Sequence, residues 1–123
     1  MAVCAYLLTA MPGVSTSGHA GSPGDPAAGA EIFKKCLVCH TKEAGKNKVG
    51  PSLFGIVGRH SAAVLGYVYS PAMKTVGMVW TDEELDRYLT RPQAVVPGTK
   101  MTFPGLPDAR ERGDLIAYLK TLR

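Results

Sequence analysis

The chain has 123 residues, which is enough for one domain with a single hydrophobic core. Aromatic residues make up only 7% of it, whereas 14 residues are glycine and 9 are proline, so the side chains alone supply little apolar material for that core. The net charge of +4 suits an acidic protein partner, but the positive charges are too dispersed for a nucleic-acid-binding protein.

Residues 1–24 differ in composition from the rest of the chain. They contain no charged side chain, and an apolar run at 2–11 precedes small residues at 13–24. This order is typical of an export signal, although the positive N-terminal region is missing. We expect a truncated signal peptide or disordered leader, a domain at 25–123 and a periplasmic location. The apolar run is too short to span a bilayer, so we expect no stable membrane insertion.

A first helix is predicted from Asp25 and Pro26 to about Lys35. The Asp25 carboxylate can accept hydrogen bonds from free N–H groups of the first turn, and proline fits the first helical position. Gly29 and Phe33 are four residues apart and share one face. The glycine there permits close approach of another helix.

The motif Cys36-Leu37-Val38-Cys39-His40 follows this helix and matches the attachment site of a c-type haem. On helical backbone, residues three apart lie on one face, so Cys36 and Cys39 can each form a thioether at the same porphyrin edge. His40 would then lie under the ring and donate a nitrogen lone pair to the iron. The haem would also supply apolar core material.

Two other chemistries share the C-x-x-C spacing. A structural zinc site needs four ligands, and the only other cysteine is Cys4. A thioredoxin-like dithiol needs a βαβ setting, and no strand pattern of useful length is present. Covalent haem is the favoured hypothesis, with zinc and dithiol chemistry as the alternatives.

Residues 41–49 are polar and include the densest basic run of the chain. The run is either a solvated loop or a positive rim around an exposed haem edge that attracts an acidic partner. A turn is predicted at residues 50–53, where the Pro51 carbonyl can accept the free ring hydrogen of His40. The basic residues of the run are Lys42, Lys46 and Lys48.

Residues 54–66 contain glycines without clean periodicity, and we expect a loop in which His60 lies at the surface and is not an iron ligand. Ser70 and Pro71 repeat the cap-and-proline signal and predict a short helix ending near Val76. Aromatic residues with polar tips surround this helix, and haem propionates would be suitable partners for them. These aromatics are Tyr67, Tyr69 and Trp80.

Two longer helices are predicted in the C-terminal half. Residues 81–84 form a capping box with an acidic first turn, and Pro92 is expected to stop the helix that follows. Asp108 with Glu111 starts the last helix. Gly113 is out of place there and should cost up to about 1 kcal/mol relative to alanine. The inward stripe of the last helix is Leu115, Tyr118, Leu119 and Leu122.

The second axial position of the iron determines the function. An open position binds oxygen or peroxide, whereas a filled one limits the iron to electron exchange. Met1 and Met11 belong to the leader, and Met73 and Met78 are more typical of core packing. Met101 lies in an irregular segment made rigid by prolines and glycines. We predict that its thioether is the second ligand, which favours ferrous iron.

These motifs resemble those of class I cytochromes c, both the mitochondrial type and bacterial cytochrome c2. The resemblance runs from Asp25 to the C-terminus. It implies an all-α fold, a small single-domain cytochrome c with four to five helices around one covalently attached haem c. The matching motifs are Gly29 with Phe33, Cys36 to His40, residues 50–53, Gly58-Arg59, Trp80, residues 97–103 and residues 115–120.

The resemblance also implies roles for individual residues. Cys36 and Cys39 carry the haem, and His40 and Met101 are the axial ligands. The Pro51 carbonyl orients the histidine. Tyr88 is implied to donate a hydrogen bond to the methionine sulfur. The residues implied at the haem propionates are Arg59, Tyr69, Ser70, Trp80 and Thr99. The implied crossing of the first and last helices consists of Gly29, Phe33, Leu115 and Tyr118.

Three residues depart from the family pattern. The basic pair that usually follows Pro92 is Gln93-Ala94 here. Met73 occupies a position near the propionates that is usually Asn, so we expect different hydrogen bonding around Tyr88. The expected docking cations are then Lys35, Lys48 and Lys100.

We therefore expect a soluble, monomeric one-electron carrier of a respiratory or photosynthetic chain, and not an enzyme. The resemblance implies acidic redox partners such as a bc1-type complex, a terminal oxidase, a reaction centre or a dehydrogenase. One alternative is a dedicated partner of a single periplasmic dehydrogenase or reductase. A haem peroxidase or ligand sensor is disfavoured because no second histidine or arginine is placed as a distal acid–base pair.

Overall fold

The computed structural model describes residues 24–123, so all but the last residue of the predicted leader lies outside the described residues. The described part forms five α-helices, one 3-10 helix and no strand, as the predicted all-α fold requires. None of these helices is long and apolar enough to cross a membrane. In chain order the elements are α1 (Pro26–Phe33), η1 (Cys36–Val38), α2 (Pro71–Val76), α3 (Asp82–Thr90), α4 (Pro92–Val95) and α5 (Ala109–Leu119).

The four predicted N-caps are all formed. In each, a hydroxyl or carboxylate oxygen accepts a hydrogen bond from a backbone N–H of its own helix, at 2.8 to 3.2 Å. These bonds satisfy donors that have no partner inside the helix, and they therefore fix where the helices begin. The capping residues are Asp25, Ser70, Thr81 and Asp108.

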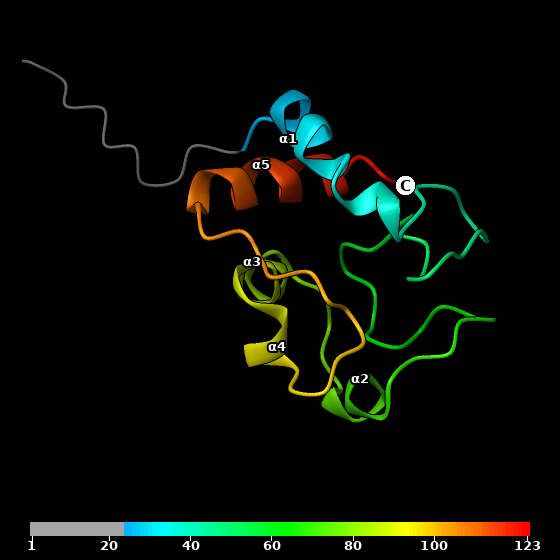
Figure 1. The fold of residues 1–123 in the computed structure, drawn as a ribbon. Helices are drawn as coiled ribbons and strands as arrows, with labels where there is room; N and C mark the ends of the chain where they lie inside the picture. The colour runs from blue at the N-terminus through cyan, green and yellow to red at the C-terminus, as the bar shows by residue number, and fades with distance from the viewer. Residues whose placement is uncertain (1–23) are drawn as a thin grey trace, which may run out of the picture.

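Helices α1 and α5 cross and pack against each other at one end of the molecule, as Figure 1 shows. The rings of Phe33 and Tyr118 lie 5.0 Å apart between their centroids. Phe33 and Leu115 are each only 1% exposed. A Cβ atom on Gly29 would collide with the Asp114 carbonyl, so the close approach of the two backbones depends on this glycine. The predicted helix crossing is confirmed.

Helix α3 packs against α5, and Arg112 joins both to the segment that leads away from residue 101. Its Nε donates to Asp86 Oδ1 at 2.7 Å, and its Nη1 donates to the carbonyls of Leu106 at 2.9 Å and Pro107 at 3.0 Å. A charged side chain that is nearly buried keeps its charge only with such partners. Arg112 therefore holds this segment under the crossing helices.

Three predicted helix boundaries differ from the structure. Helix α1 ends at Phe33 and not near Lys35, and α5 ends at Leu119, so Leu122 lies beyond it. The region after α3 was predicted to be irregular from Pro92 onward, but α3 ends at Thr90 and Pro92 begins α4. Proline lacks an N–H group and fits the first turn of a helix, so the same residue ends one helix and starts the next.

Candidate haem site

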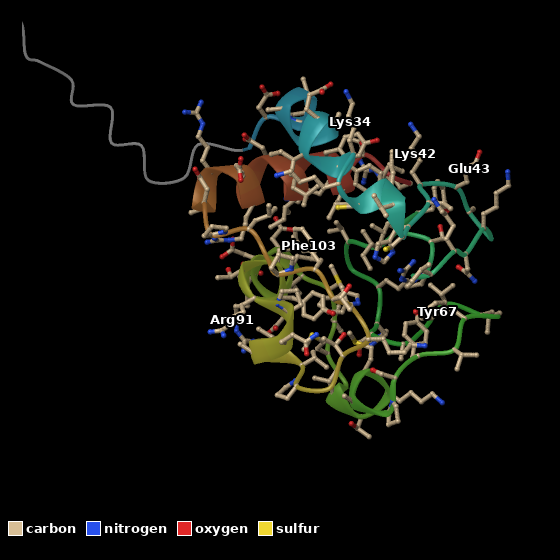
Figure 2. The ribbon with its side chains drawn as sticks, viewed as in Figure 1. Lys34, Lys42, Glu43, Tyr67, Arg91 and Phe103 are labelled. Atoms are coloured by element: carbon tan, nitrogen blue, oxygen red, sulfur yellow. The ribbon has the colours of Figure 1, made fainter. Side chains whose placement is uncertain are left out.

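A cavity of about 420 Å³ opens between the helices and the loops of residues 41–70. In Figure 2, Phe103 lies in the segment below α5 and Tyr67 lies on a loop across the molecule from it, and both line this cavity. Every predicted site residue lines it as well, although these residues span positions 36 to 101. They are Cys36, Cys39, His40, Pro51, Arg59, Tyr69, Ser70, Trp80, Tyr88, Thr99 and Met101.

The two thiols are carried by a short 3-10 helix. The N–H of Cys39 donates to the Cys36 carbonyl at 3.1 Å, and the N–H of His40 donates to the same carbonyl at 2.8 Å. Both cysteines are free and partly buried. Burial raises the pKa of Cys36 to about 11, so its thiol is protonated at neutral pH.

The alternatives for these cysteines find no support in residues 24–123. Within that range no three His, Cys, Asp or Glu side chains are arranged to hold a metal ion, which disfavours a zinc site. The dithiol alternative required a βαβ unit, and the same residues form no strand.

The imidazole of His40 is held in one orientation. Its Nδ1–H donates to the Pro51 carbonyl at 2.7 Å, as predicted, which leaves Nε2 as the nitrogen with a free lone pair. Burial lowers the pKa of His40, so the ring is neutral, the form that binds metals.

Gly50 packs directly against the His40 ring, a contact that the sequence analysis did not anticipate. A Cβ atom at this position would lie 2.7 Å from His40 Nδ1 and closer still to Cε1. The Gly50 N–H also donates to the Cys39 carbonyl at 2.7 Å, which ties the turn to the motif. The sequence predicts only a turn at Gly50. The position of this glycine next to Pro51, whose carbonyl orients the ring, is the signal that identifies it.

Met101 lies in a loop whose hydrogen bonding differs from the one that the resemblance implies. The implied partner of the Tyr88 hydroxyl was the Met101 sulfur, whereas in the structure it is the Thr99 hydroxyl, at 3.0 Å. The Met101 N–H also reaches the Thr99 hydroxyl at 3.3 Å, so this hydroxyl lies between the tyrosine and the methionine backbone. Burial raises the pKa of Tyr88, which keeps its hydroxyl protonated.

Arg59 brings a half-buried positive charge to the cavity. Its Nη1 donates to the Phe54 carbonyl and its Nη2 to the Ser52 carbonyl, both at 3.0 Å. Burial lowers its pKa, because the charged guanidinium is partly removed from water. No ion pair among residues 24–123 includes Arg59. A bound anionic group such as a propionate would supply the missing counter-charge.

The other predicted propionate partners already have contacts within the protein. The Tyr69 hydroxyl accepts from the Val64 N–H at 3.0 Å, and the Ser70 hydroxyl caps α2 through the Met73 N–H at 3.1 Å. The Trp80 ring packs on the Tyr88 ring, with 4.9 Å between the ring centroids. These contacts hold the three side chains in place at the cavity wall.

Two predictions about residues outside the ligand set are confirmed. Met73 is buried, with 8% of its surface exposed, and its thioether lines the same cavity as that of Met101. His60 is exposed and its backbone pairs with Val79, so it lies at the surface as expected.

The residues present fit a covalently attached haem. Two thiols on one turn, an oriented neutral imidazole and a thioether supply the attachment points and two neutral donors. The walls are mostly apolar, and Arg59 offers an unbalanced positive charge. Such a wall fits a large apolar ring with acidic substituents.

Known proteins support this interpretation of the site. The family model described as cytochrome c matches residues 26–123. Cytochrome c2 of Rhodopila globiformis is 54% identical over 102 residues, which cover 82% of this chain and 96% of that protein. Cytochrome c2 of Blastochloris viridis is 50% identical over 97 residues, which cover 78% and 76%. The solved structure of cytochrome cH from Methylobacterium extorquens matches with a TM-score of 0.75 and 45% identity, over 80% of this chain and 99% of that chain.

The family match begins at the first residue of α1 and continues to the end of the chain. It therefore includes both crossing helices, the Cys36–His40 motif and the loop of Met101. The residues matched by the family model therefore include the predicted domain motifs, the described helices and the lining of the cavity. The chain belongs to the cytochrome c family, and it is an electron-transfer protein with a covalently bound haem c rather than an enzyme.

Proposed function

We propose that this protein carries single electrons through a haem whose iron is ligated by His40 and Met101. The observation behind the proposal is the cavity, in which two thiols, one oriented imidazole and this thioether meet. The bound haem supplies reversible one-electron exchange between ferrous and ferric iron. With both axial positions filled by side chains, small molecules do not reach the metal.

The surrounding residues have defined tasks in this proposal. Cys36 and Cys39 anchor the ring through thioether bonds, and Pro51 keeps His40 in the tautomer that binds iron. Met101 provides a soft, neutral donor that favours the ferrous state. Arg59 balances the charge of the propionates, and the Tyr69, Ser70, Trp80 and Thr99 side chains contact them as neutral polar groups. A rigid protein frame lets the electron transfer with little structural change.

Replacing the two cavity methionines one at a time tests the ligand assignment. We expect Met101→Leu to abolish the sulfur-to-iron charge-transfer band of the ferric protein and to admit cyanide readily. Met73→Leu is the matched control, because Met73 lines the same cavity, and this variant should keep the band. Loss of the band in Met73→Leu with retention in Met101→Leu would overturn the assignment.

The partners of this electron carrier are redox proteins, and we propose that they present an acidic surface. The expected docking cations Lys48 and Lys100 are both held by the protein. Lys48 Nζ donates to the Leu37 carbonyl at 2.6 Å, and Lys100 Nζ donates to the Val68 carbonyl. Lys35 and Lys100 line the cavity. Together with Lys48, they would form a positive rim for a bc1-type complex, a terminal oxidase, a reaction centre or a dehydrogenase.

We also propose that the protein is a periplasmic monomer whose residues 1–24 serve as an export leader. The composition of that segment and the relationship to bacterial cytochromes c2 support this location. N-terminal sequencing of the native protein tests it. A mature chain that begins near Asp25 is expected, and one that retains residues 1–24 would contradict the proposal.

A dedicated partner of one dehydrogenase or reductase is the second candidate. Gln93 and Ala94 replace the usual basic pair, which reduces the positive charge beside the loop of Met101. Rates of electron transfer to several partners, measured across ionic strength, separate the two functions. A general carrier shows steep salt dependence with each acidic partner, whereas a dedicated one reacts fast with a single protein.

A further inference from the structure

We infer that Gln93 is a positioning residue that holds the Met101 loop closed, an inference that rests on the proposed ligation by Met101. The side-chain amide of Gln93 extends from α4 to this loop. Its Nε2 donates to the Met101 carbonyl at 2.8 Å and to the Thr99 carbonyl at 3.2 Å. One side chain thus bridges the two carbonyls on either side of Lys100.

These two bonds have no substitute within the described residues. In residues 24–123, no other hydrogen bond reaches the carbonyl oxygen of Thr99 or of Met101. Both carbonyls would turn to solvent if the amide were removed. Fixing the carbonyl of Met101 fixes the orientation of its peptide group, and the direction of its thioether follows from that.

Other contacts hold the loop from different directions. The Thr99 hydroxyl meets Tyr88 at 3.0 Å from the α3 side, and Lys100 donates to the Val68 carbonyl from the side of the 61–70 loop. On the α4 side, the Thr99 N–H donates to the Val96 carbonyl at 3.0 Å. Among the described residues, Gln93 makes the only hydrogen bond between Met101 and α4. The loop between Pro97 and Pro104 has no helix or strand of its own.

The two hydrogen bonds from Gln93 require a side chain of glutamine's length that ends in two N–H donors. Methionine has a similar length and helix propensity but no donor, and glutamate presents acceptors to carbonyl oxygens. Ala94 is the neighbouring residue of α4, and it is exposed. Substitutions at 94 therefore provide a control on the same helix that leaves the two bonds in place.

Competition by an external ligand measures how often Met101 leaves the iron. Imidazole binds the ferric protein only when the thioether has moved away, so its apparent affinity rises with the population of the open loop. We expect Gln93→Met and Gln93→Glu to raise this affinity by about tenfold, as for the loss of two solvent-exposed hydrogen bonds. Ala94→Met should change it by less than about twofold on the same scale.

The results separate this inference from the proposed function. Met101→Leu should remove the competition and raise imidazole affinity further than either Gln93 variant. If Met101→Leu leaves the affinity unchanged, the axial assignment is wrong. If Met101→Leu raises the affinity but Gln93→Met and Gln93→Glu do not, the positioning role of Gln93 is wrong. A lower denaturation midpoint in the Gln93 variants with unchanged imidazole affinity would show only a structural role and would also overturn the inference.

Discussion

The interiors of the two sides of the molecule are filled in different ways. At the crossing of α1 and α5, protein atoms fill the space, since Phe33 and Leu115 are 1% exposed and Gly29 leaves no room for a Cβ atom. On the other side, the walls enclose a cavity of about 420 Å³. The crossing is therefore specified by contacts within the chain, whereas the cavity side depends on the haem for its packing.

Removing the haem should have the largest effect. At about 24 cal/mol per Å³, an empty cavity of about 420 Å³ costs up to about 10 kcal/mol, which is similar to the whole stability of a domain of this size. The crossing helices have 8 and 11 residues and are too short to persist alone. We expect haem-free Cys36→Ser/Cys39→Ser protein to lose most helical circular dichroism. A cooperative thermal transition of that protein would contradict the comparison.

Gly29→Ala should disrupt the crossing in the holoprotein. The new Cβ atom would meet the Asp114 carbonyl and lie 2.8 Å from Tyr118 Cβ, so the helices must separate. We expect the free energy of unfolding, measured with denaturant, to fall by about 3 kcal/mol. A change below about 1 kcal/mol would mean that the crossing tolerates separation and is less tightly specified than the cavity side.

Gly50→Ala is the corresponding change on the cavity side. Its Cβ atom would press on the His40 ring, and we expect a loss of about 2 kcal/mol in stability together with a shifted reduction potential. Gly45→Ala is the control, because Gly45 has a φ of +73° but nothing within 4 Å of the new atom. It should carry backbone strain without changing the potential. Equal potentials in both variants would disprove a role of Gly50 at the ring.

Gly113→Ala should stabilise the protein, in contrast to the other glycine of the crossing. Gly113 lies inside α5, and a Cβ atom there meets nothing within 4 Å. We expect an increase of up to about 1 kcal/mol in the free energy of unfolding, since alanine is the better helix former. A destabilised variant would show that the crossing needs more space around Gly113 than the structure indicates.

Ala62→Gly should have the smallest effect, and it tests the loops of the cavity side. Ala62 has a φ of 56°, and within residues 24–123 it is the sole residue other than glycine in the left-handed region. Glycine relieves that strain but enlarges the unfolded ensemble and removes a partly buried methyl group. The expected net gain is about 0.5 kcal/mol by denaturant unfolding. A clear loss would indicate that packing of this methyl group outweighs the strain.

Local signals predicted the starts of the helices well. Asp25, Ser70, Thr81 and Asp108 each have a side chain that can cap its own helix, and all four do so. Helix α4 was missed because Pro92 carries two opposite signals, an end for the preceding helix and a start for the next. The extended backbone of Arg91 between the two helices shows that both signals apply.

The amino-acid sequence alone predicted the chemistry of the site, because the motif of Cys36, Cys39 and His40 is defined by short-range spacing that no distant contact alters. It also identified Met101 as the candidate second ligand from the rigid character of its loop. Tertiary structure decided which groups support these residues. The contacts of Gly50 with the imidazole, of Thr99 with Tyr88 and of Gln93 with the Met101 loop join separate elements. Such contacts depend on how the elements pack against each other, and this packing cannot be predicted from the spacing of residues along the chain.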